Sequence, residues 1–341
     1  MTTIYDVAAR AGVSPATVSR VFNGQPVSEA KVSAVRTAAS DLGFVPNRNA
    51  RRLRTQQSEI VAMLIPDVEN PFFTTMVRAV TDVARAAGLW VMLCNTDDDP
   101  QIEAEFIRVA VSEPVAGLIV APTGPRTDLS VALSRNVPVV CVDRDAPQFD
   151  VDTVVADNVS GGMSATEELL RLGHRRVGCL SGPEGVMTAD LRVEGWREAV
   201  RAATGEYPSD DLLVRGSYTI ETGEQGMAAL MALAEPVDAV FAANNRLAVG
   251  AMRYLFRTGT DPEAIRVASL GELAARLYIP RGMIVTHLPA RELGKRSAEL
   301  LVDRISGHLG PGRREVLPTV MTDDEETFTT TFPLIDEEYQ R

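Results

Sequence analysis

Motifs of nucleotide-dependent, hydrolytic and metal-dependent enzymes are absent from this sequence. It has no G-x-x-x-x-G-K-S/T phosphate loop, no G-x-G-x-x-G fingerprint after a first strand and no G-x-S-x-G nucleophile elbow. Its three histidines, His174, His287 and His308, are isolated from one another and lack the spacing of metal ligands. We therefore expect a protein that is not an enzyme and that uses no metal ion or other cofactor.

Cysteine is scarce, and long apolar runs are missing. Cys94, Cys141 and Cys179 lie in separate apolar stretches without C-x-x-C spacing, which predicts buried, reduced thiols. No apolar run approaches the roughly 18 residues of a membrane span, and the N-terminus lacks the charged-then-apolar pattern of a signal peptide. These features favour a cytoplasmic protein that has no membrane partner.

Basic residues are outnumbered by acidic residues in the whole chain, but not near its N-terminus. The 341 residues carry a formal net charge of −12. Residues 1–59 nevertheless contain eight arginines or lysines against four acids, whereas the rest of the chain contains 26 against 42. This distribution of charge should attract the N-terminal segment to phosphate groups and repel the acidic body from them.

The sequence from Ala8 to Gly24 has the pattern of two short helices joined by a tight turn. Gly12 can adopt the left-handed conformation that ends a helix, Ser14 is a candidate N-cap, and Pro15 fits the first position of a second helix. That helix would turn hydroxyl, amide and cationic side chains outward, which suits base edges in a DNA major groove. A helical hairpin with a merely solvated polar face is the alternative.

Two further segments complete the N-terminal region. Ser28 is a candidate cap for a third helix that ends near Leu42. Residues 46–59 are polar and contain four arginines and one large apolar residue, Leu53, so we expect a mobile linker in the free protein. On DNA this linker could form a short helix with Leu53 as an apolar wedge in the minor groove, although a plain flexible tether explains the same composition.

From Ile60 onward, short apolar runs alternate with segments of helical periodicity. Expected strands lie at 60–65, 89–94, 117–121, 138–142, 153–155, 177–180, 213–216, 239–243, 267–270 and 283–288, with a closing strand near 315–320. This alternation predicts an α/β fold with doubly wound parallel sheets. Because about ten such steps exceed one sheet, we expect two similar lobes with a ligand cleft between them.

A set of short motifs is spread over nearly the whole chain. They are Ile4–Ala8, Gly12–Val21, Pro46–Asn47, Ala50–Leu53, Asn70–Phe73, Val142–Arg144, Asp157–Asn158, Leu172–Arg176, Arg192–Trp196 and Ala242–Asn244. Together they resemble the LacI/GalR (lactose-repressor) family of transcription regulators. The resemblance implies a small all-α helix-turn-helix head and a two-lobed body like a periplasmic binding protein. It also implies a homodimer that binds a near-palindromic double-stranded DNA operator and a small-molecule effector, which we expect to be a carbohydrate.

The resemblance also implies where the domains begin and end. The helix-turn-helix DNA-binding domain would cover residues 1–46 and the hinge residues 47–59. Residues 60–341 would form the two-lobed domain for effector binding and dimerisation. Within it, lobe one would comprise about 60–157 and 287–320, and lobe two about 158–286.

Ten residues receive DNA-binding roles from the resemblance. Pro15, Ala16 and Arg20 match positions that read bases, and Leu53 matches the hinge leucine that wedges into the central base step. Positions that contact phosphates or flanking groups correspond to Ser14, Thr17, Ser19 and Asn23, and the set is completed by Asn47 and Arg51.

Seven residues receive effector-binding roles in the same way. Phe72 and Phe73 match entrance positions that pack on the ligand, and Tyr218 matches an aromatic residue that stacks on it. The polar contacts correspond to Asp143, Thr188, Arg192 and Asn244. Aromatic rings over an apolar face, with fixed polar groups around it, suit a small polyhydroxylated or planar polar ligand. For Phe72 and Tyr218 taken singly, a plain core role explains the residue as well.

The chain departs from the family pattern at two places. Gly271-Glu272-Leu273-Ala274 stands where the family usually has Gly-Phe-Asp-Asp, so Glu272 is a candidate replacement for an aspartate that anchors the effector. Asn245 stands where many relatives have aspartate. We expect a homodimeric repressor of a catabolic operon, controlled by a sugar or sugar derivative bound between two lobes. The alternative is a two-lobed solute-binding protein without a regulatory DNA role.

Overall fold

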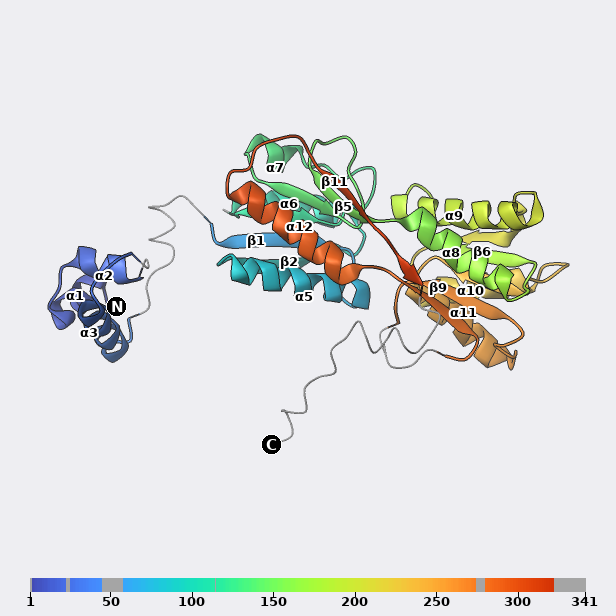
Figure 1. The fold of residues 1–341 in the computed structure, drawn as a ribbon, viewed down its shortest axis with the longest axis horizontal. Coiled ribbons are helices and arrows are strands. Elements are labelled where there is room, and N and C mark those ends of the chain that lie inside the picture. Colours follow the sequence, from blue (N-terminus) through green and yellow to red (C-terminus); the bar gives the residue numbers. More distant parts are fainter. Residues whose placement is uncertain (1, 23–24, 45–57, 114, 274–279, 322–341) are drawn as a thin grey trace, which may run out of the picture. The chain divides into compact units, whose positions relative to one another are not determined.

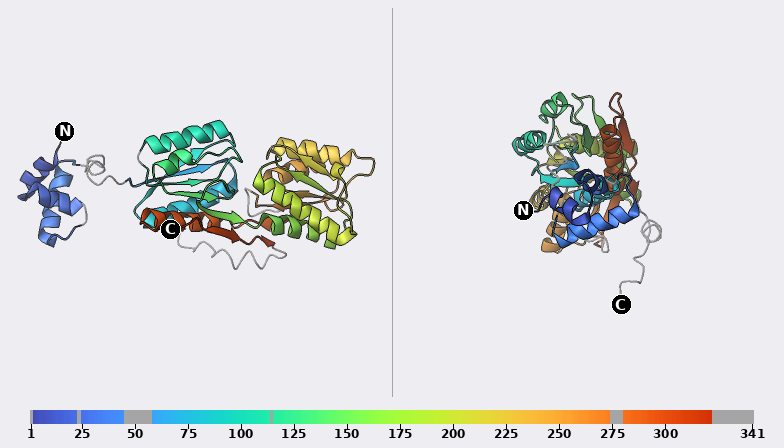
Figure 2. Two further views of the ribbon diagram at one scale, coloured as in Figure 1. Left: turned by 90° about the horizontal axis from the view of Figure 1, so that it is seen from above. Right: turned by 90° about the vertical axis from the view of Figure 1, so that its left-hand side faces the viewer.

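The protein divides into two compact units, residues Met1–Ser58 and Glu59–Arg341. The computed structural model describes residues 2–22, 25–44, 58–113, 115–273 and 280–321. The first unit is helical, and the second contains two α/β lobes, each built on its own sheet (Figures 1 and 2).

The helical unit is held together by a small apolar core. Its elements are α1 (Ile4–Ala11), α2 (Pro15–Phe22) and α3 (Glu29–Asp41). One valine from each helix, Val7, Val18 and Val35, is fully buried where the helices meet. Such a core is small for a folded unit, so the ends of the helices matter for its stability.

The capping features that the sequence predicts are found at two helix ends and are incomplete at a third. Gly12 ends α1 with a φ of 65°, and the Oγ of Ser14 accepts a hydrogen bond of 3.2 Å from the backbone N–H of Thr17. Both expectations are confirmed. Ser28 occupies the N-cap position of α3, as predicted, but its side chain makes no capping hydrogen bond.

Lobe one is a six-stranded parallel sheet with helices on both faces. Its strands are β1 (Ile60–Ile65), β2 (Trp90–Asn95), β3 (Gly117–Val120), β4 (Val139–Val142), β5 (Asp152–Ala156) and β11 (Arg314–Leu317), in the order β11-β5-β4-β3-β1-β2. Its helices are α5 (Pro71–Ala86), α6 (Pro100–Ser112), α7 (Ser130–Ser134) and α12 (Ala290–Ile305). Along β1, Met63 and Ile65 join the apolar cluster on one face, and Ala62 and Leu64 join the cluster on the other. Both faces of this strand are therefore buried, as its unbroken apolar run predicts.

Lobe two repeats this architecture. Its strands are β6 (Val177–Ser181), β7 (Leu213–Arg215), β8 (Ala239–Ala242), β9 (Arg266–Leu270), β10 (Met283–His287) and β12 (Val320–Met321), in the order β12-β10-β9-β8-β6-β7. Its helices are α8 (Asn158–Arg171), α9 (Met187–Thr204), the short 3₁₀ helix η1 (Asp210–Leu212), α10 (Ile220–Met231) and α11 (Asn245–Thr258). The strands are parallel except β12, which pairs with β10 in the antiparallel sense.

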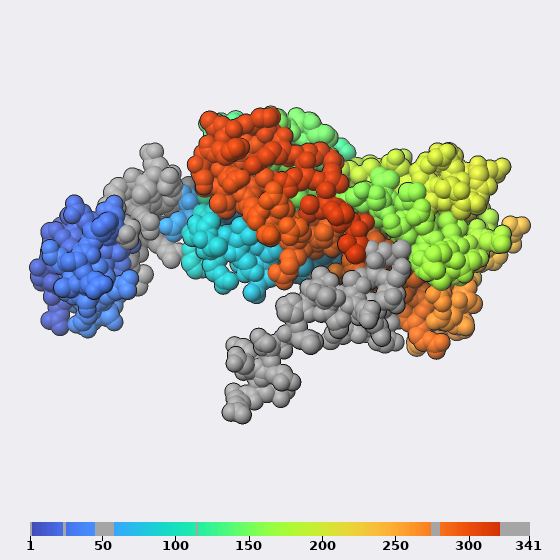
Figure 3. Space-filling model, viewed as in Figure 1, coloured from blue at the N-terminus to red at the C-terminus, as the bar shows by residue number. Residues whose placement is uncertain are grey.

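The chain passes between the lobes three times. It crosses from β5 to α8, from β10 to α12, and from β11 to β12 (Figure 1). The sequence predicts one closing strand near 315–320, and the structure has two short strands there, β11 and β12, which belong to different sheets. The segment that carries α12, β11 and β12 runs along one face of the body from lobe one to lobe two (Figure 3).

Glycines allow neighbouring helices in lobe two to pack with their backbones in contact. A Cβ atom at Gly195 of α9 would lie 2.2 Å from the backbone oxygen of Val159 in α8. A Cβ at Gly250 of α11 would lie 2.1 Å from the backbone oxygen of Ile220 in α10. These distances are far below van der Waals contact, so only glycine permits the observed helix spacing.

The Gly195→Ala variant should therefore be markedly less stable than the wild type. The added methyl group collides with backbone atoms that cannot rotate away, and we expect a loss of about 3 kcal/mol in the free energy of unfolding. Urea unfolding followed by circular dichroism measures this change. Glu194→Ala is the matched control, because Glu194 is the exposed neighbour on the same helix. Equal stability of the two variants would show that α8 and α9 can separate without cost.

Candidate ligand cleft and DNA-binding helix

A cleft of about 830 Å³ lies between the two lobes. Its walls are the loops and helix ends that follow strands of both sheets, including β1, β2 and β4 in lobe one and β6, β8 and β9 in lobe two. All seven residues that the sequence assigns to an effector line this cleft: Phe72, Phe73, Asp143, Thr188, Arg192, Tyr218 and Asn244. Residues that lie as far apart as 172 positions in the chain are thus gathered at the carboxyl ends of strands.

The two phenylalanines stand at the start of α5. The Oδ1 atom of Asn70 caps this helix by accepting a hydrogen bond of 3.1 Å from the backbone N–H of Phe72. The rings of Phe72 and Phe73 meet edge to face, with centroids 5.0 Å apart and planes at 74°. Phe73 is buried, whereas Phe72 is half-buried and so presents apolar surface to the cleft.

Arg192 is held rigidly in the wall formed by lobe two. Its side chain is buried, with Nε donating to Asn158 Oδ1 at 2.7 Å and Nη1 donating to the backbone oxygen of Ala243 at 2.7 Å. A buried guanidinium is costly unless its N–H groups are satisfied, and these two bonds supply much of that satisfaction. The direction of the side chain is therefore set by the fold of lobe two.

Asp143 and Arg144 form the charged part of the wall in lobe one, and Arg144 was given no role by sequence reasoning. The Nη1 atom of Arg144 donates to Asp98 Oδ1 at 2.6 Å and to the backbone oxygen of Pro122 at 3.1 Å. Burial raises the pKa of Asp143, and the nearby Arg144 and Arg192 oppose this shift. The motif Val142–Arg144 pointed to this place, but the partner Asp98 is too distant in the chain to be recognised from sequence.

Besides the hydroxyl of Thr123, three buried polar atoms of the cleft make no hydrogen bond of normal geometry to any residue that the structure describes. They are Asp143 Oδ1, Arg144 Nε and the hydroxyl of Tyr218, which lies beside Thr188. The Nε of Arg144 is 3.7 Å from Asp143 Oδ2, which is too far for a hydrogen bond. Buried polar atoms are nearly always satisfied, so these three mark a place for polar groups of a ligand or for water.

The asparagines at the start of α11 are committed largely to protein contacts. The Oδ1 of Asn244 caps the helix by accepting from the backbone N–H of Leu247 at 2.8 Å. The Nδ2 of Asn245 donates to the backbone oxygen of Glu272 at 2.8 Å.

Glu272 is not among the residues that line the cleft, because its carboxylate contacts the imidazole of His287 at 3.1 Å. The hypothesis that Glu272 replaces the family aspartate at the ligand therefore gains no geometric support.

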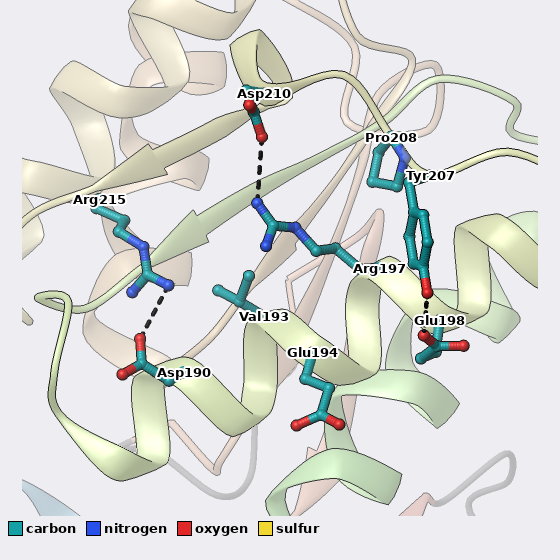
Figure 4. Close-up of a pocket in the computed structure, with 9 residues that line it drawn as sticks. All are labelled: Asp190, Val193, Glu194, Arg197, Glu198, Tyr207, Pro208, Asp210 and Arg215. Atoms are coloured by element: carbon teal, nitrogen blue, oxygen red, sulfur yellow. Dashed lines mark hydrogen bonds and ion pairs between the residues drawn. The ribbon is translucent and has the colours of Figure 1, made fainter.

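A second hollow of about 620 Å³ lies on lobe two and contains none of the residues assigned to the effector (Figure 4). Charged side chains pair with one another across it, with Arg197 Nη2 3.2 Å from Asp210 Oδ1 and Arg215 Nη2 2.9 Å from Asp190 Oδ1. These pairs span an open groove, whereas all seven residues assigned to the effector line the cleft between the lobes.

In the helical unit, α2 presents a polar surface away from its core. Ser14, Ala16 and Arg20 are exposed, and Pro15, Thr17 and Ser19 are half-buried. Val18 is buried, so the apolar and polar sides of the helix are separated as the sequence predicts. The other residues assigned to DNA, Asn23, Asn47, Arg51 and Leu53, lie outside the described residues.

In the part of the chain that the structure describes, no group of three or more histidine, cysteine, aspartate or glutamate side chains is placed to hold a metal ion. None of the described helices is both long and apolar enough to span a membrane.

Two family models together match most of the chain. The one described as bacterial regulatory proteins, lacI family, matches residues 3–47. The one described as periplasmic binding proteins and sugar binding domain of LacI family matches residues 58–331. The first match covers α1 to α3, and the second covers both lobes.

Single proteins of similar sequence or structure indicate the same family as the two models. The chain is 30% identical over 316 residues to the HTH-type transcriptional repressor CytR of Escherichia coli (strain K12), covering 92% of each chain, and 34% identical over 303 residues to the regulator GalR of the same organism, covering 88% of each. Its structure resembles the lac repressor dimer bound to operator and the anti-inducer ONPF, with a TM-score of 0.82, 25% identity and coverage of 94% and 97%. It also resembles a CelR–cellobiose complex, with a TM-score of 0.71, 30% identity and coverage of 94% and 98%. This chain therefore belongs to the LacI family of bacterial regulatory proteins.

Proposed function

We propose that this protein is a sequence-specific, DNA-binding transcriptional repressor whose affinity for its operator is controlled by a sugar in the cleft. One observation carries the proposal: the chain joins a helix-turn-helix unit to a two-lobed, ligand-binding body, and its curated relatives are named as repressors. A solute-binding protein without a DNA role would need the cleft but not the helical unit. The family match over residues 3–47 therefore favours the repressor.

Base reading is assigned to α2, with Arg20 as its principal cation. The exposed Arg20 has the length and the paired N–H donors to contact a guanine edge, and Ala16 leaves room for close approach to the groove. Ser14, Thr17 and Ser19 supply hydroxyl groups for phosphates. We extend the DNA contact to Asn23, Asn47, Arg51 and Leu53 on the family pattern alone.

The effector is proposed to be a small neutral sugar. The buried guanidinium of Arg144 is paired with Asp98, and Arg192 already uses its Nε and Nη1 donors on Asn158 and Ala243, so few N–H donors remain for a phosphate or carboxylate. A hydroxyl group can donate to Asp143 Oδ1 while another accepts from Arg144 Nε. A related regulator from Enterococcus faecium with bound ribose, 27% identical with a TM-score of 0.67, supports this class of ligand.

Control of DNA binding follows from the position of the effector between two lobes. A ligand that contacts both walls binds the closed arrangement more tightly than an open one, and it shifts the population accordingly. The lobes would pass this change to the helical unit through the hinge. Whether the sugar favours release or binding of the operator depends on which arrangement suits the operator.

A homodimer is proposed because a near-palindromic operator presents two equivalent half-sites. Each lobe carries exposed apolar side chains that suit an interface. On lobe one these are Trp90, Met92 and Leu93 of the edge strand β2, and on lobe two they are Val249 and Phe256 of α11, of which Phe256 is 86% exposed. The related lac repressor structure is described as a dimer.

Replacing Arg20 with alanine should weaken specific binding more than nonspecific binding. Loss of a base contact costs about tenfold in affinity for the operator, whereas loss of one charge weakens binding to all DNA alike. Fluorescence anisotropy with operator and scrambled duplexes at one salt concentration measures both affinities. Arg36→Ala removes an equally exposed charge from α3 and is the control. If the specific-to-nonspecific ratio survived in the Arg20 variant, Arg20 would not read bases.

A neutral sugar should raise the melting temperature of the protein. We expect D-ribose or cellobiose to shift Tm by roughly 5 °C at a hundredfold excess over Kd, and ribose 5-phosphate to give no shift. Asp143→Ala should abolish the shift, because the carboxylate oxygen that accepts from the sugar is lost. Asp210→Ala, which lies in the groove of lobe two in Figure 4, should leave it intact. Stabilisation by the phosphate ester alone would contradict a neutral effector.

Charges placed on the apolar strips should separate the dimer. The double variant Met92→Glu/Phe256→Glu introduces desolvated carboxylates into the proposed interface, and sedimentation velocity should show a monomer of unchanged fold. Leu172→Glu/Leu309→Glu alters exposed leucines elsewhere and is the control. A dimer that persisted in the first variant would place the interface on another surface.

A further inference from the structure

In the part of the chain that the structure describes, an ion pair and a hydrogen bond join the lobes directly across the cleft, and none of the seven residues assigned to the effector makes them. The guanidinium of Arg246 in lobe two forms an ion pair with the carboxylate of Asp67 in lobe one. Beside it, Asn245 Nδ2 donates to Asn70 Oδ1 at 3.2 Å. Asp67 and Asn70 lie in the loop between β1 and α5, and Asn245 and Arg246 are the first two residues of α11.

Within lobe one, the residues of this contact are fixed by their own loop. Asp67 uses one carboxylate oxygen, Oδ1, to accept from the backbone N–H of Glu69 at 2.9 Å, which leaves Oδ2 for Arg246. The Oδ1 of Asn70 caps α5 through the N–H of Phe72. The lobe-one half therefore needs no help from lobe two to take its shape.

The half in lobe two is built in the same way. The Oδ1 of Asn245 accepts from the backbone N–H of Arg246 at 2.9 Å, and its Nδ2 also donates to the backbone oxygen of Glu272. Among the side-chain hydrogen bonds and ion pairs of the described residues, separating the lobes would therefore break the two that cross the cleft here. Each half would keep its local hydrogen bonds, so each would keep the geometry that is needed to form the two contacts again.

Charged groups elsewhere in the cleft do not bridge it. Arg144 is hydrogen-bonded to Asp98 within lobe one, and Arg192 is hydrogen-bonded to Asn158 and Ala243 within lobe two. Among the ion pairs of the residues that the structure describes, the pair of Asp67 and Arg246 is the one that joins the two walls of the cleft. Closing the cleft thus gains a direct ion pair that no effector supplies, in addition to the longer-range attraction between Arg192 and Asp143.

We propose that Asp67 and Arg246, which line the cleft, are positioning residues that latch the lobes together and so raise the affinity of the cleft for its effector by favouring closure. This inference rests on the proposed function, in which a ligand is held between the lobes. A contact made only in the closed arrangement stabilises that arrangement with or without ligand. By linkage, whatever favours closure also tightens the binding of any ligand that prefers the closed state.

The latch has a consequence that a purely structural contact would not have. The side chains of Arg246 and Asp67 retain 32% and 26% of their exposure, so dissolved salt screens their attraction. The closed population, and with it the affinity for an uncharged sugar, should therefore fall as the salt concentration rises. A neutral ligand in a cleft without an ionic latch would show no such dependence.

The test measures closure in the full-length protein without any ligand. Nitroxide labels are placed at Glu105→Cys on α6 and Gln225→Cys on α10, which are exposed positions of lobe one and lobe two, while the native cysteines are buried. Labelled chains are diluted into unlabelled protein, so that pulsed dipolar spectroscopy reports distances within one chain. The ratio of short to long distances gives the ratio of closed to open molecules.

Arg246→Gln and Asp67→Asn should each lower the closed-to-open ratio by about two- to fivefold, as expected for a partly exposed ion pair. Raising the salt from about 0.05 to about 0.5 M should lower the ratio in the wild type but not in these variants. The exchanged variant Asp67→Arg/Arg246→Asp should restore much of the closed population. Arg253→Gln, which removes an ion pair with Glu224 inside lobe two, should leave the ratio unchanged.

Two results would overturn the latch. One is a distance distribution that is the same in the wild type and both single variants at either salt concentration. The other is opening in the single variants without recovery in the exchanged variant, because that outcome means a local structural role. The sugar screen is independent of this measurement: a sugar that binds through Asp143 while the latch variants stay closed would support the proposed function and reject the latch.

Discussion

Two buried guanidinium groups set the arrangement of the cleft. Arg144 and Arg192 lie at the meeting of two sheets, where an unsatisfied cation would be strongly destabilising. Each is bonded inside its own lobe, to Asp98 and Pro122 in one case and to Asn158 and Ala243 in the other. Neither guanidinium therefore depends on the other lobe for these hydrogen bonds, and the polar atoms left over point to a ligand with hydroxyl groups.

The helix packing of lobe two supports this arrangement. A Cβ atom at Gly162 in α8 would lie 2.4 Å from the backbone oxygen of Arg192 in α9, so glycine there lets the two helices touch. Asn158 stands at the start of α8, and the close approach of α9 brings the guanidinium of Arg192 within hydrogen-bond distance of it. Gly162 thus helps to fix the direction of the Arg192 side chain. In this way the packing of α8 against α9 influences the shape of the ligand cleft.

Closure of the cleft depends on contacts of another kind. Ion pairs inside a lobe, such as Arg304 with Asp152, contribute to folding and are present in every arrangement of the lobes. The pair of Asp67 and Arg246 exists only while the lobes are close, so it affects the balance between arrangements and hardly affects folding. A regulator needs both kinds, because the lobes must be stable while their relative position stays adjustable.

Local features of this protein were determined by the sequence alone. Gly12, Ser14 and the apolar run of β1 act over a few residues, and periodicity and capping chemistry reveal them without further information. Tertiary structure decided the rest: it divided residues 315–320 between two sheets, paired Glu272 with His287, and joined Arg246 to Asp67 across 179 positions. Such contacts depend on the order of strands in the sheets and on the closure of the lobes, and no local pattern of residues carries that information.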